Sequence, residues 1–401
     1  MNAEVKSGKL TELGVIPEEW NCCSIEQLVS DGILEKPMDG NHGNIHPKSS
    51  DFVSDGIPFV MANNIKDGSV DLRNCSFIRK SQADNLQKGF SKQGDVLLTH
   101  KATIGQVAIV GCIKTEYIML TPQVTYYRVL NTSLLNNIYL RHFFESDVFQ
   151  RVLQSRSGGG TRSYIGITAQ RLLPVLLPPL AEQLTIAGCL SDFDTLINCL
   201  DQLIAKKSDI KQAAMQELLT GQQRLPGFSG EWEVKRLGDV LRVRHGKNQS
   251  AIVVSDGKFP VLATGGEIGR TNTFLYDKPS VLIGRKGTID RPIYRDEPFW
   301  TVDTLFYTEI TKEAVPVFIY YKFLMIDWRS YNEASGVPSL NASTIEAVDI
   351  VIPDIPEQTA IAAILSDMDS EIIALETRRD KAHQLKHGMM QELLTGRIRL
   401  L

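Results

Sequence analysis

The chain has 401 residues, which exceeds one ordinary domain and predicts two or three compact units. A charged fraction of 22% is typical of a globular protein, no run approaches the roughly 20 apolar residues of a membrane span, and residues 1–14 lack a signal-peptide core, so we expect a cytoplasmic protein with no membrane partner. The net charge of −4 gives no support to nucleic-acid binding, so any DNA-binding surface must be a local patch of Lys and Arg.

The loop 38–48 is the first candidate site along the chain. It lies among short β-branched runs broken by Gly and Pro, which predict strands with many loops. Its side chains can hydrogen-bond base edges or phosphate, so His42, Asn44 and Lys48 are candidate DNA contacts. Two alternatives remain, a structural turn and a metal site built from the Asp and the two His of this loop, although the spacing is no metal signature.

The segment 155–164 combines three consecutive glycines with two arginines. Glycines let a backbone approach phosphate closely, and Arg156 and Arg162 can reach a phosphate or a guanine edge. The segment follows no strand at the spacing of a nucleotide loop, so we do not expect a nucleotide site and favour DNA contact. Asn341 lies in the corresponding segment 335–341 and is a candidate for the same role.

Residues 179–222 predict one long helix. Its apolar side chains recur at spacings of 4, 3, 4, 3 and 4 in Ile186, Leu190, Phe193, Ile197, Leu200 and Ile204. This spacing is typical of a coiled-coil seam rather than of the wider stripe of a helix on a sheet. Two prolines at 178–179 can start the helix, and Gly221 can end it. Cys189 and Cys199 are too far apart on one helix to bond, and we expect all six cysteines to be reduced thiols.

The segment 242–247 is the densest basic stretch of the chain. If it is an extended strand, Arg242 and Arg244 lie on one face, and His245 and Lys247 follow. A DNA-binding edge and a solvated edge strand are equally compatible with this pattern.

Residues 223–353, the second predicted domain, echo residues 1–178, the first. Both begin with GluTrp, and LysGlyThrIle at 286–289 has an imperfect twin in LysAlaThrIle at 101–104. The two loops open at matching positions with dibasic pairs, which favours DNA contact by His100, Lys101, Arg285 and Lys286. The second domain departs from the first at Gly287 and Asp290, which face Ala102 and Gly105, and it lacks the LysAspGly stretch at 66–68.

Residues 354–401 predict a second long helix that repeats the first. MetGlnGluLeuLeuThrGly occurs at 215–221 and again at 390–396, an offset of 175 that holds without gaps back to Glu182 and Glu357. About half of the forty paired positions are identical, which chance does not produce. Two unrelated surface helices are the alternative, but the shared sequence favours mutual packing.

This arrangement resembles the specificity (S) subunits of type I restriction-modification systems. The resemblance is carried by ProProLeuAlaGluGln (178–183), IleProGluGln (355–358), the two GluLeuLeuThrGly helix ends, the GluTrp openings and the paired LysAlaThrIle and LysGlyThrIle loops. It spans essentially the whole chain, and the order and duplication of the motifs are more specific than any single motif.

The resemblance implies a mixed α/β (α+β) fold with a pseudo-twofold internal repeat. Two target recognition domains, residues 1–178 and 223–353, would be separated by two long antiparallel coiled-coil helices, residues 179–222 and 354–401. The implied role is sequence-specific binding to a bipartite site on double-stranded DNA, which directs partner subunits in adenine methylation and restriction. The implied partners are two methyltransferase (M) subunits and the restriction (R) subunits.

No enzyme motif replaces this interpretation. The chain has no AspProProTyr-like tetrapeptide, no GxxxxGK[ST] loop and no glycine motif for a methyl donor. We therefore expect a non-catalytic subunit without a cofactor of its own, with S-adenosylmethionine, ATP and Mg²⁺ bound by the partners. The alternative function is a coiled-coil scaffold that holds two partners and does not read DNA.

Overall fold

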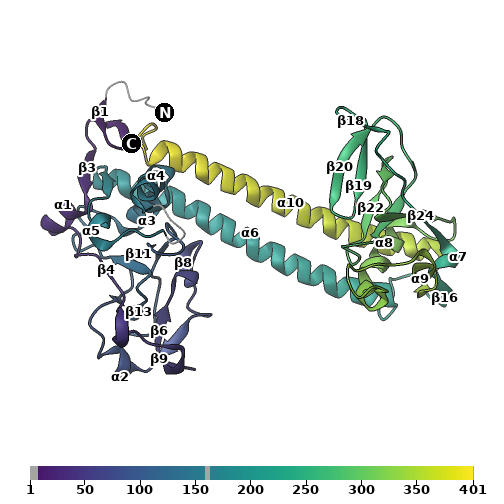
Figure 1. Cartoon of the computed structure of the whole chain (residues 1–401), viewed down its shortest axis with the longest axis horizontal. Helices are drawn as coiled ribbons and strands as arrows, with labels where there is room; N and C mark the ends of the chain where they lie inside the picture. Colours follow the sequence, from purple (N-terminus) through teal and green to yellow (C-terminus); the bar gives the residue numbers. More distant parts are fainter. Residues whose placement is uncertain (1–7, 159–162, 401) are drawn as a thin grey trace. The chain divides into compact units, whose positions relative to one another are not determined.

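The computed structural model describes residues 8–158 and 163–400, apart from the side chain of Asn44. The chain divides into two compact units: unit 1 comprises Met1–Cys199 and Arg379–Leu401, and unit 2 comprises Leu200–Arg378. The helices α6 (Leu180–Thr220) and α10 (Ile355–Leu393) each contribute one part to either unit (Figure 1). The mixed α/β class is therefore confirmed, and no helix among the described residues is long and apolar enough to cross a membrane.

Proline and glycine set the ends of both long helices. α6 begins directly after Pro178 and Pro179, because a proline, which has no N–H to donate, fits only the first turn of a helix. Gly221 follows its last residue at φ +73°, the left-handed conformation that glycine adopts without strain. Gly396, the equivalent of Gly221 in the repeat, follows α10 at φ +72°, so the predicted repeat extends to the backbone of the helix ends.

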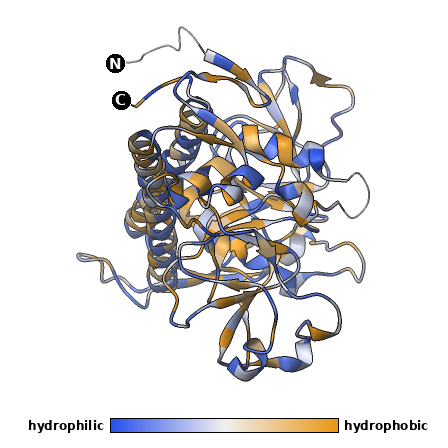
Figure 2. Ribbon diagram, turned by 90° about the vertical axis from the view of Figure 1, so that its left-hand side faces the viewer, coloured by the Kyte–Doolittle hydropathy of each residue, from blue (hydrophilic) through white to orange (hydrophobic). Residues whose placement is uncertain are grey.

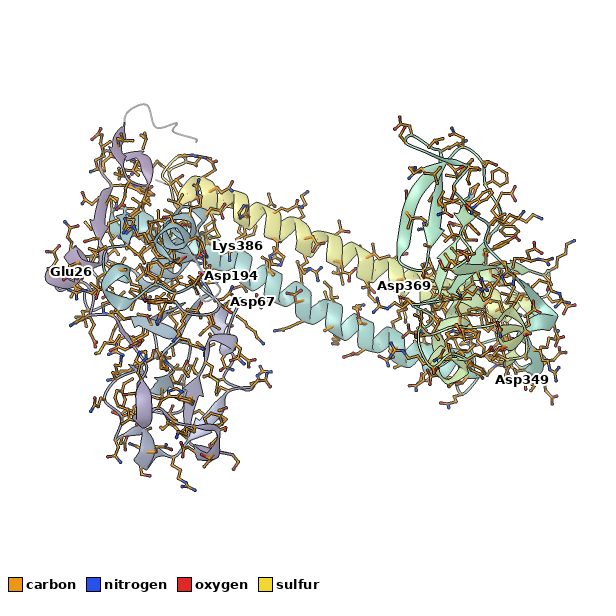
Figure 3. All side chains as sticks on the ribbon, in the orientation of Figure 1. Glu26, Asp67, Asp194, Asp349, Asp369 and Lys386 are labelled. Carbon is orange, nitrogen blue, oxygen red and sulfur yellow. The ribbon has the colours of Figure 1, made fainter. Side chains whose placement is uncertain are left out.

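α6 and α10 run antiparallel within each unit. In unit 1 the Lys386 ammonium pairs with Asp194, as Figure 3 shows for these two labelled side chains on facing helices. In unit 2 Lys211 pairs with Asp369. The two lysines occupy equivalent positions of the sequence repeat, and so do the two aspartates, so the repeat is built into the contacts themselves.

The apolar faces of the helices are wider at their ends than a coiled-coil seam. In unit 1, Ile186 and Leu190 are buried in one cluster with Trp20, Met390 and Leu393. In unit 2 the equivalent cluster holds Met215, Leu218, Leu219, Ile361 and Leu365 together with core residues of the domain. The helix ends are therefore part of each domain core, and not only partners of each other.

Each unit fixes the start of one long helix with the same clamp. In unit 1, Glu182 is only 3% exposed and accepts hydrogen bonds from Arg399 Nε at 2.6 Å, Arg399 Nη2 at 2.8 Å and Trp20 Nε1 at 3.0 Å. The unit 2 clamp, with the same donor atoms at 2.6–3.1 Å, consists of Glu357, Arg224 and Trp232. The GluTrp openings seen in the sequence are explained by this contact.

Unit 1 holds two larger sheets. The five-stranded sheet has the order β10 (Phe90–Ser91), β13 (Ile118–Leu120), β6 (Ile57–Val60), β9 (Ser76–Ile78), β5 (Phe52–Val53). The six-stranded sheet has the order β4 (Met38–Asp39), β14 (Val124–Tyr127), β11 (Val96–Thr99), β12 (Val107–Ile109), β8 (Gly68–Val70), β7 (Ile65–Lys66). The shorter helices of unit 1 are α1 (Ile25–Ser30), α2 (Lys80–Ala83), α3 (Asn137–Glu145), α4 (Asp147–Arg156) and α5 (Ile167–Gln170). The 3₁₀ turns of unit 1 are η1 (Gly43–Ile45), η2 (Ser49–Asp51) and η3 (Ala62–Asn64).

Two small two-stranded sheets complete unit 1. They are the hairpin β1 (Gly8–Thr11) with β2 (Gly14–Pro17), and β3 (Asn21–Ser24) with β15 (Pro174–Leu177). Strands β6, β11, β13 and β14 are buried at every position and consist mostly of apolar residues, and Figure 2 shows much hydrophobic (orange) sequence in the sheets.

Unit 2 repeats this framework with smaller sheets. One has the order β17 (Leu241–Arg244), β24 (Leu305–Ile310), β21 (Ser280–Gly284), β22 (Ile293–Arg295), and the other β18 (Val253–Val254), β20 (Gly266–Thr271), β19 (Phe259–Ala263), β23 (Trp300–Thr301). β16 (Glu233–Arg236) pairs with β25 (Asp349–Ile352), as β3 pairs with β15. The helices are α7 (Leu237–Val240), α8 (Pro316–Met325) and α9 (Ala342–Glu346), with the 3₁₀ turn η4 (Trp328–Tyr331).

Candidate nucleic-acid interface

The two lysine loops have the same backbone geometry. Lys101 follows the buried strand β11 and forms an isolated antiparallel bridge with Tyr164. Lys286 follows the buried strand β21 and forms the same bridge with Ser339. Both lysines are exposed. Each lysine loop therefore contacts one of the two segments, 155–164 and 335–341, that the sequence identified as counterparts of each other.

The residue after each lysine has a left-handed conformation. Ala102 has φ +67° and Gly287 has φ +90°. A residue with a Cβ is strained there by about 1 kcal/mol, whereas glycine is not. The difference between the two loop sequences is therefore one of backbone strain and not of backbone path. Backbone strain retained in a loop often marks a functional position.

His100, which was predicted as a DNA contact, is buried in this structure. It is 5% exposed, and its Nδ1 lies 2.9 Å from the Thr125 hydroxyl. Burial lowers the pKa of His100 to about 4, even though Asp39 lies 3.9 Å away. The ring is therefore neutral at physiological pH. Arg285, at the matching position, is half-buried and donates to the Asp303 carbonyl at 3.2 Å.

The loop 38–48 folds around a buried carboxylate. Burial raises the pKa of Asp39, but hydrogen bonds from Lys88 and His42 outweigh it and hold that pKa below its usual value. His42 Nε2 lies 2.7 Å from Asp39, and the His42 side chain is 55% exposed. Lys48 is exposed, and its backbone N–H donates to Asp51 at 2.7 Å. The side chain of Asn44 lies outside the described residues.

A cavity of about 290 Å³ brings His42 and Lys101 together in unit 1. Gln123 and Thr121 also line it, and neither was predicted, because no motif surrounds them. Polar and apolar residues both line the cavity, and Lys101 is the permanent cation among them. The described residues contain no group of three or more His, Cys, Asp or Glu side chains arranged to hold a metal ion.

The other arginine and asparagine candidates have partners within the chain. Arg156 Nη2 donates to Glu12 at 2.5 Å, and its Nη1 donates to the Leu172 carbonyl. Asn341 donates to Glu333. Arg162 lies outside the described residues. Arg156 and Asn341 are therefore oriented by contacts within the chain, and each keeps further donors that these hydrogen bonds do not use.

The basic strand of unit 2 is exposed but partly neutralised. In β17 burial alternates, so Arg242 and Arg244 share the exposed face, as predicted. Arg244 pairs with Glu309 at 2.8 Å, and this hydrogen bond raises the pKa of Arg244. Arg242 donates to the Gly238 carbonyl.

The residues that follow this strand are better placed to meet a ligand. His245 is exposed, and its ring packs edge-on against Phe306 at a centroid distance of 4.9 Å. Lys247 is exposed, and its backbone is held by the Thr301 carbonyl and Trp300 Nε1 at 2.8 and 2.9 Å. Of the segment 242–247, Lys247 is thus an exposed cation on a fixed backbone.

Known proteins share this sequence pattern. A family model described as "Type I restriction modification DNA specificity domain" matches residues 31–207 and 229–384. The putative type I restriction enzyme MjaX specificity subunit of Methanocaldococcus jannaschii is 24% identical, with 98% of this chain and 96% of the relative covered. The type I restriction enzyme EcoKI specificity subunit of Escherichia coli is 27% identical over 39% of this chain and 33% of its own length.

Solved structures share the fold. The crystal structure of the type I restriction-modification system S subunit from M. genitalium aligns with a TM-score of 0.65 at 16% identity, covering 96% of this chain and 97% of the other. A chain from a study of complex assembly in the type I R-M system aligns with a TM-score of 0.55 at 14% identity, covering 95% and 99%.

Proposed function

This chain belongs to the family of type I restriction modification DNA specificity domains, and we propose that unit 1 and unit 2 each read one half of a bipartite DNA site. The observation that carries the proposal is the duplicated loop geometry, in which an exposed lysine precedes a left-handed residue and bridges to a second loop. Two copies of one binding geometry in one chain suit two half-sites. The loops differ in their neighbouring side chains, so each unit can read its own bases.

Local charge supports DNA binding where overall charge does not. Lys48, Lys101, Lys247 and Lys286 are exposed, and none of them has an ion-pair partner among the described residues. Unpaired lysines release condensed counterions when they meet phosphate, which favours binding. A net charge of −4 is compatible with this, because binding to phosphate depends on the charge of the local surface and not on that of the whole chain.

We also infer the partners from the family role. Two methyltransferase subunits would bind one chain, because the clamp and helix-end sequences occur twice. Those subunits and the restriction subunits would supply S-adenosylmethionine, ATP and Mg²⁺, while this non-catalytic chain selects the site of adenine methylation. The mass of the purified complex tests the stoichiometry, and a complex with one methyltransferase subunit contradicts it.

A segment exchange tests whether the units read independently. Residues 225–353 are replaced with the matching segment of another family member, and methylated adenines are mapped in cells that also express the partner subunits. We expect one half of the methylated motif to change while the other half stays the same.

The reciprocal exchange of residues 21–177 is the control and should change only the other half. If both halves change in either exchange, the units do not read separate half-sites. If methylation continues at the original motif in both exchanges, the chain is a scaffold that does not read DNA.

A further inference from the structure

A cavity of about 510 Å³ lies in unit 2 beside the LysGlyThrIle loop. Its lining joins Thr288, Asp290 and Arg291, from the loop, with Arg329 from η4. Neither arginine belongs to a motif, and the strands β22, β23 and β24 and the helix α8 lie between them in the sequence. Only the fold brings them to one cavity.

One hydrogen bond orients the Arg329 guanidinium and leaves its other donors available. Its Nε donates to Asp290 Oδ2 at 2.7 Å, and its side chain is 77% exposed. A guanidinium has five N–H donors, and the two terminal nitrogens of Arg329 have no hydrogen-bond partner among the residues that the structure describes. Asp290 therefore holds the group in place and leaves the donors of both terminal nitrogens available.

Arg291 adds a second cation to the cavity. It is exposed, and within the described ranges it has neither a hydrogen bond nor an ion pair. Its charge acts on the neighbouring Asp290 only through space. Two guanidinium groups and one carboxylate leave the cavity with a net charge of +1.

The walls of the cavity are tied together by hydrogen bonds. Gly287 N–H donates to the Pro338 carbonyl at 2.9 Å, which joins the loop to the facing segment. Asn332 Oδ1 accepts from Ala334 N–H at 3.1 Å and from Ser339 N–H at 2.9 Å. Because these contacts already order the backbone, a ligand pays little entropy for fixing it.

In unit 1 the residues that align with Asp290 and Arg291 are uncharged. There Gln150 Nε2 donates to the Gly105 carbonyl at 2.9 Å, and Gln106 follows where unit 2 has Arg291. Gly105 has φ +94°, a left-handed conformation that glycine adopts without strain, and a Cβ on it would displace the end of the Gln150 side chain. Gly105 of unit 1 thus contacts the Gln150 amide, whereas Asp290 at the aligned position of unit 2 contacts Arg329.

We propose that the cavity between Arg291 and Arg329 binds one phosphate group of the DNA backbone next to the half-site read by unit 2. This proposal rests on the proposed function and adds a contact that the sequence did not predict. Guanidinium groups match phosphate oxygens in charge and in geometry. A phosphate contact fixes the position of the duplex and carries no base information, so it strengthens binding to every sequence.

The test measures affinity as a function of salt. Arg291→Gln is purified with its methyltransferase partner and titrated with a duplex that carries the mapped target, between 50 and 200 mM salt. Loss of one phosphate contact lowers the salt slope by about 1, so the unmodified complex should lose about fourfold more affinity over this range than the variant. The methylated motif should stay the same.

Asp290→Asn provides a change of opposite sign. The amide oxygen can still accept from Arg329, but the negative charge beside the phosphate is gone, so binding should tighten. Arg236→Gln is the matched control, because Arg236 is 72% exposed and lies on β16, away from the cavity lining. It should leave the salt slope unchanged.

Three results overturn the proposal. One is an Arg291→Gln salt slope equal to that of the control, another is weaker binding by Asp290→Asn, and the third is a relaxed base at one position of the motif, which indicates a base contact. Failure of the proposed function looks different, because the unmodified complex itself would then show no preference for the mapped duplex.

Discussion

We expect that breaking the clamp of unit 1 from one side destabilises that unit by several kcal/mol. Arg399→Met removes both charged hydrogen bonds to Glu182, whose carboxylate is 3% exposed and becomes a buried charge without its cation. Breaking such a pair from one side costs about 3–5 kcal/mol, and Trp20 Nε1 still donates to Glu182, so we expect the lower end, about 3 kcal/mol. For a unit of this size that loss lowers Tm by roughly 6–12 °C.

The assay is denaturant unfolding of the full chain followed by circular dichroism, with hydrogen exchange to identify the unit that opens. Arg397→Met is the matched control, because Arg397 is 68% exposed and its contact with Glu392 is 3.6 Å long. It should change the free energy of unfolding by less than about 0.5 kcal/mol.

A double variant separates the charge effect from lost packing. Glu182→Gln combined with Arg399→Met removes the buried charge and keeps an acceptor for Trp20, so it should be more stable than Arg399→Met alone. The reasoning is refuted if Arg399→Met costs no more than the control, or if the double variant is the less stable of the two.

Three further predictions follow from the loops and the helices. The pKa of His100 is about 4 in the folded chain and about 6.5 in the unfolded chain. Because the unfolded state binds more protons between these values, the free energy of unfolding should rise by about 3 kcal/mol as the pH increases across this window. His100→Gln should flatten this rise in acid unfolding curves, and an unchanged slope would show that His100 is not its source. Ala102→Gly should stabilise unit 1 by about 1 kcal/mol, and Gly287→Ala should destabilise unit 2 by about as much, because each change removes or adds a Cβ at a left-handed residue. A Cβ at position 287 meets only Thr264, at 3.6 Å, so steric contact adds little to the backbone strain. If thermal unfolding shows that both variants shift stability in the same direction, this reasoning is contradicted. Inserting four residues at equivalent places in α6 and α10 lengthens each helix by about 6 Å and advances the helix phase by about 40°. The methylated motif should therefore keep both half-sites, with a spacer that is one or two base pairs longer. An active variant with the original spacer would show that the helices do not set the distance between the half-sites.

The repeat, the helix ends and the family could be predicted from the sequence. Each depends on order along the chain: a constant offset between the two copies of the repeat, prolines before a helix and Gly221 or Gly396 after it. Helix formation is governed by neighbours three and four residues away, so a local pattern is sufficient to place α6 and α10. The pairing of the two lysine loops also followed from matched sequence.

Which side chains are free to meet DNA was decided only by the tertiary structure. His100 and Lys101 are adjacent in sequence, yet one is buried and the other exposed, because successive side chains at the end of a strand point to opposite faces. Arg244 forms an ion pair with Glu309, and the two residues lie close together only because β17 pairs with β24. Arg291 and Arg329 line one cavity although 37 other residues separate them in the sequence. Burial and ion pairing depend on residues brought together from distant parts of the chain, and no local pattern encodes those neighbours.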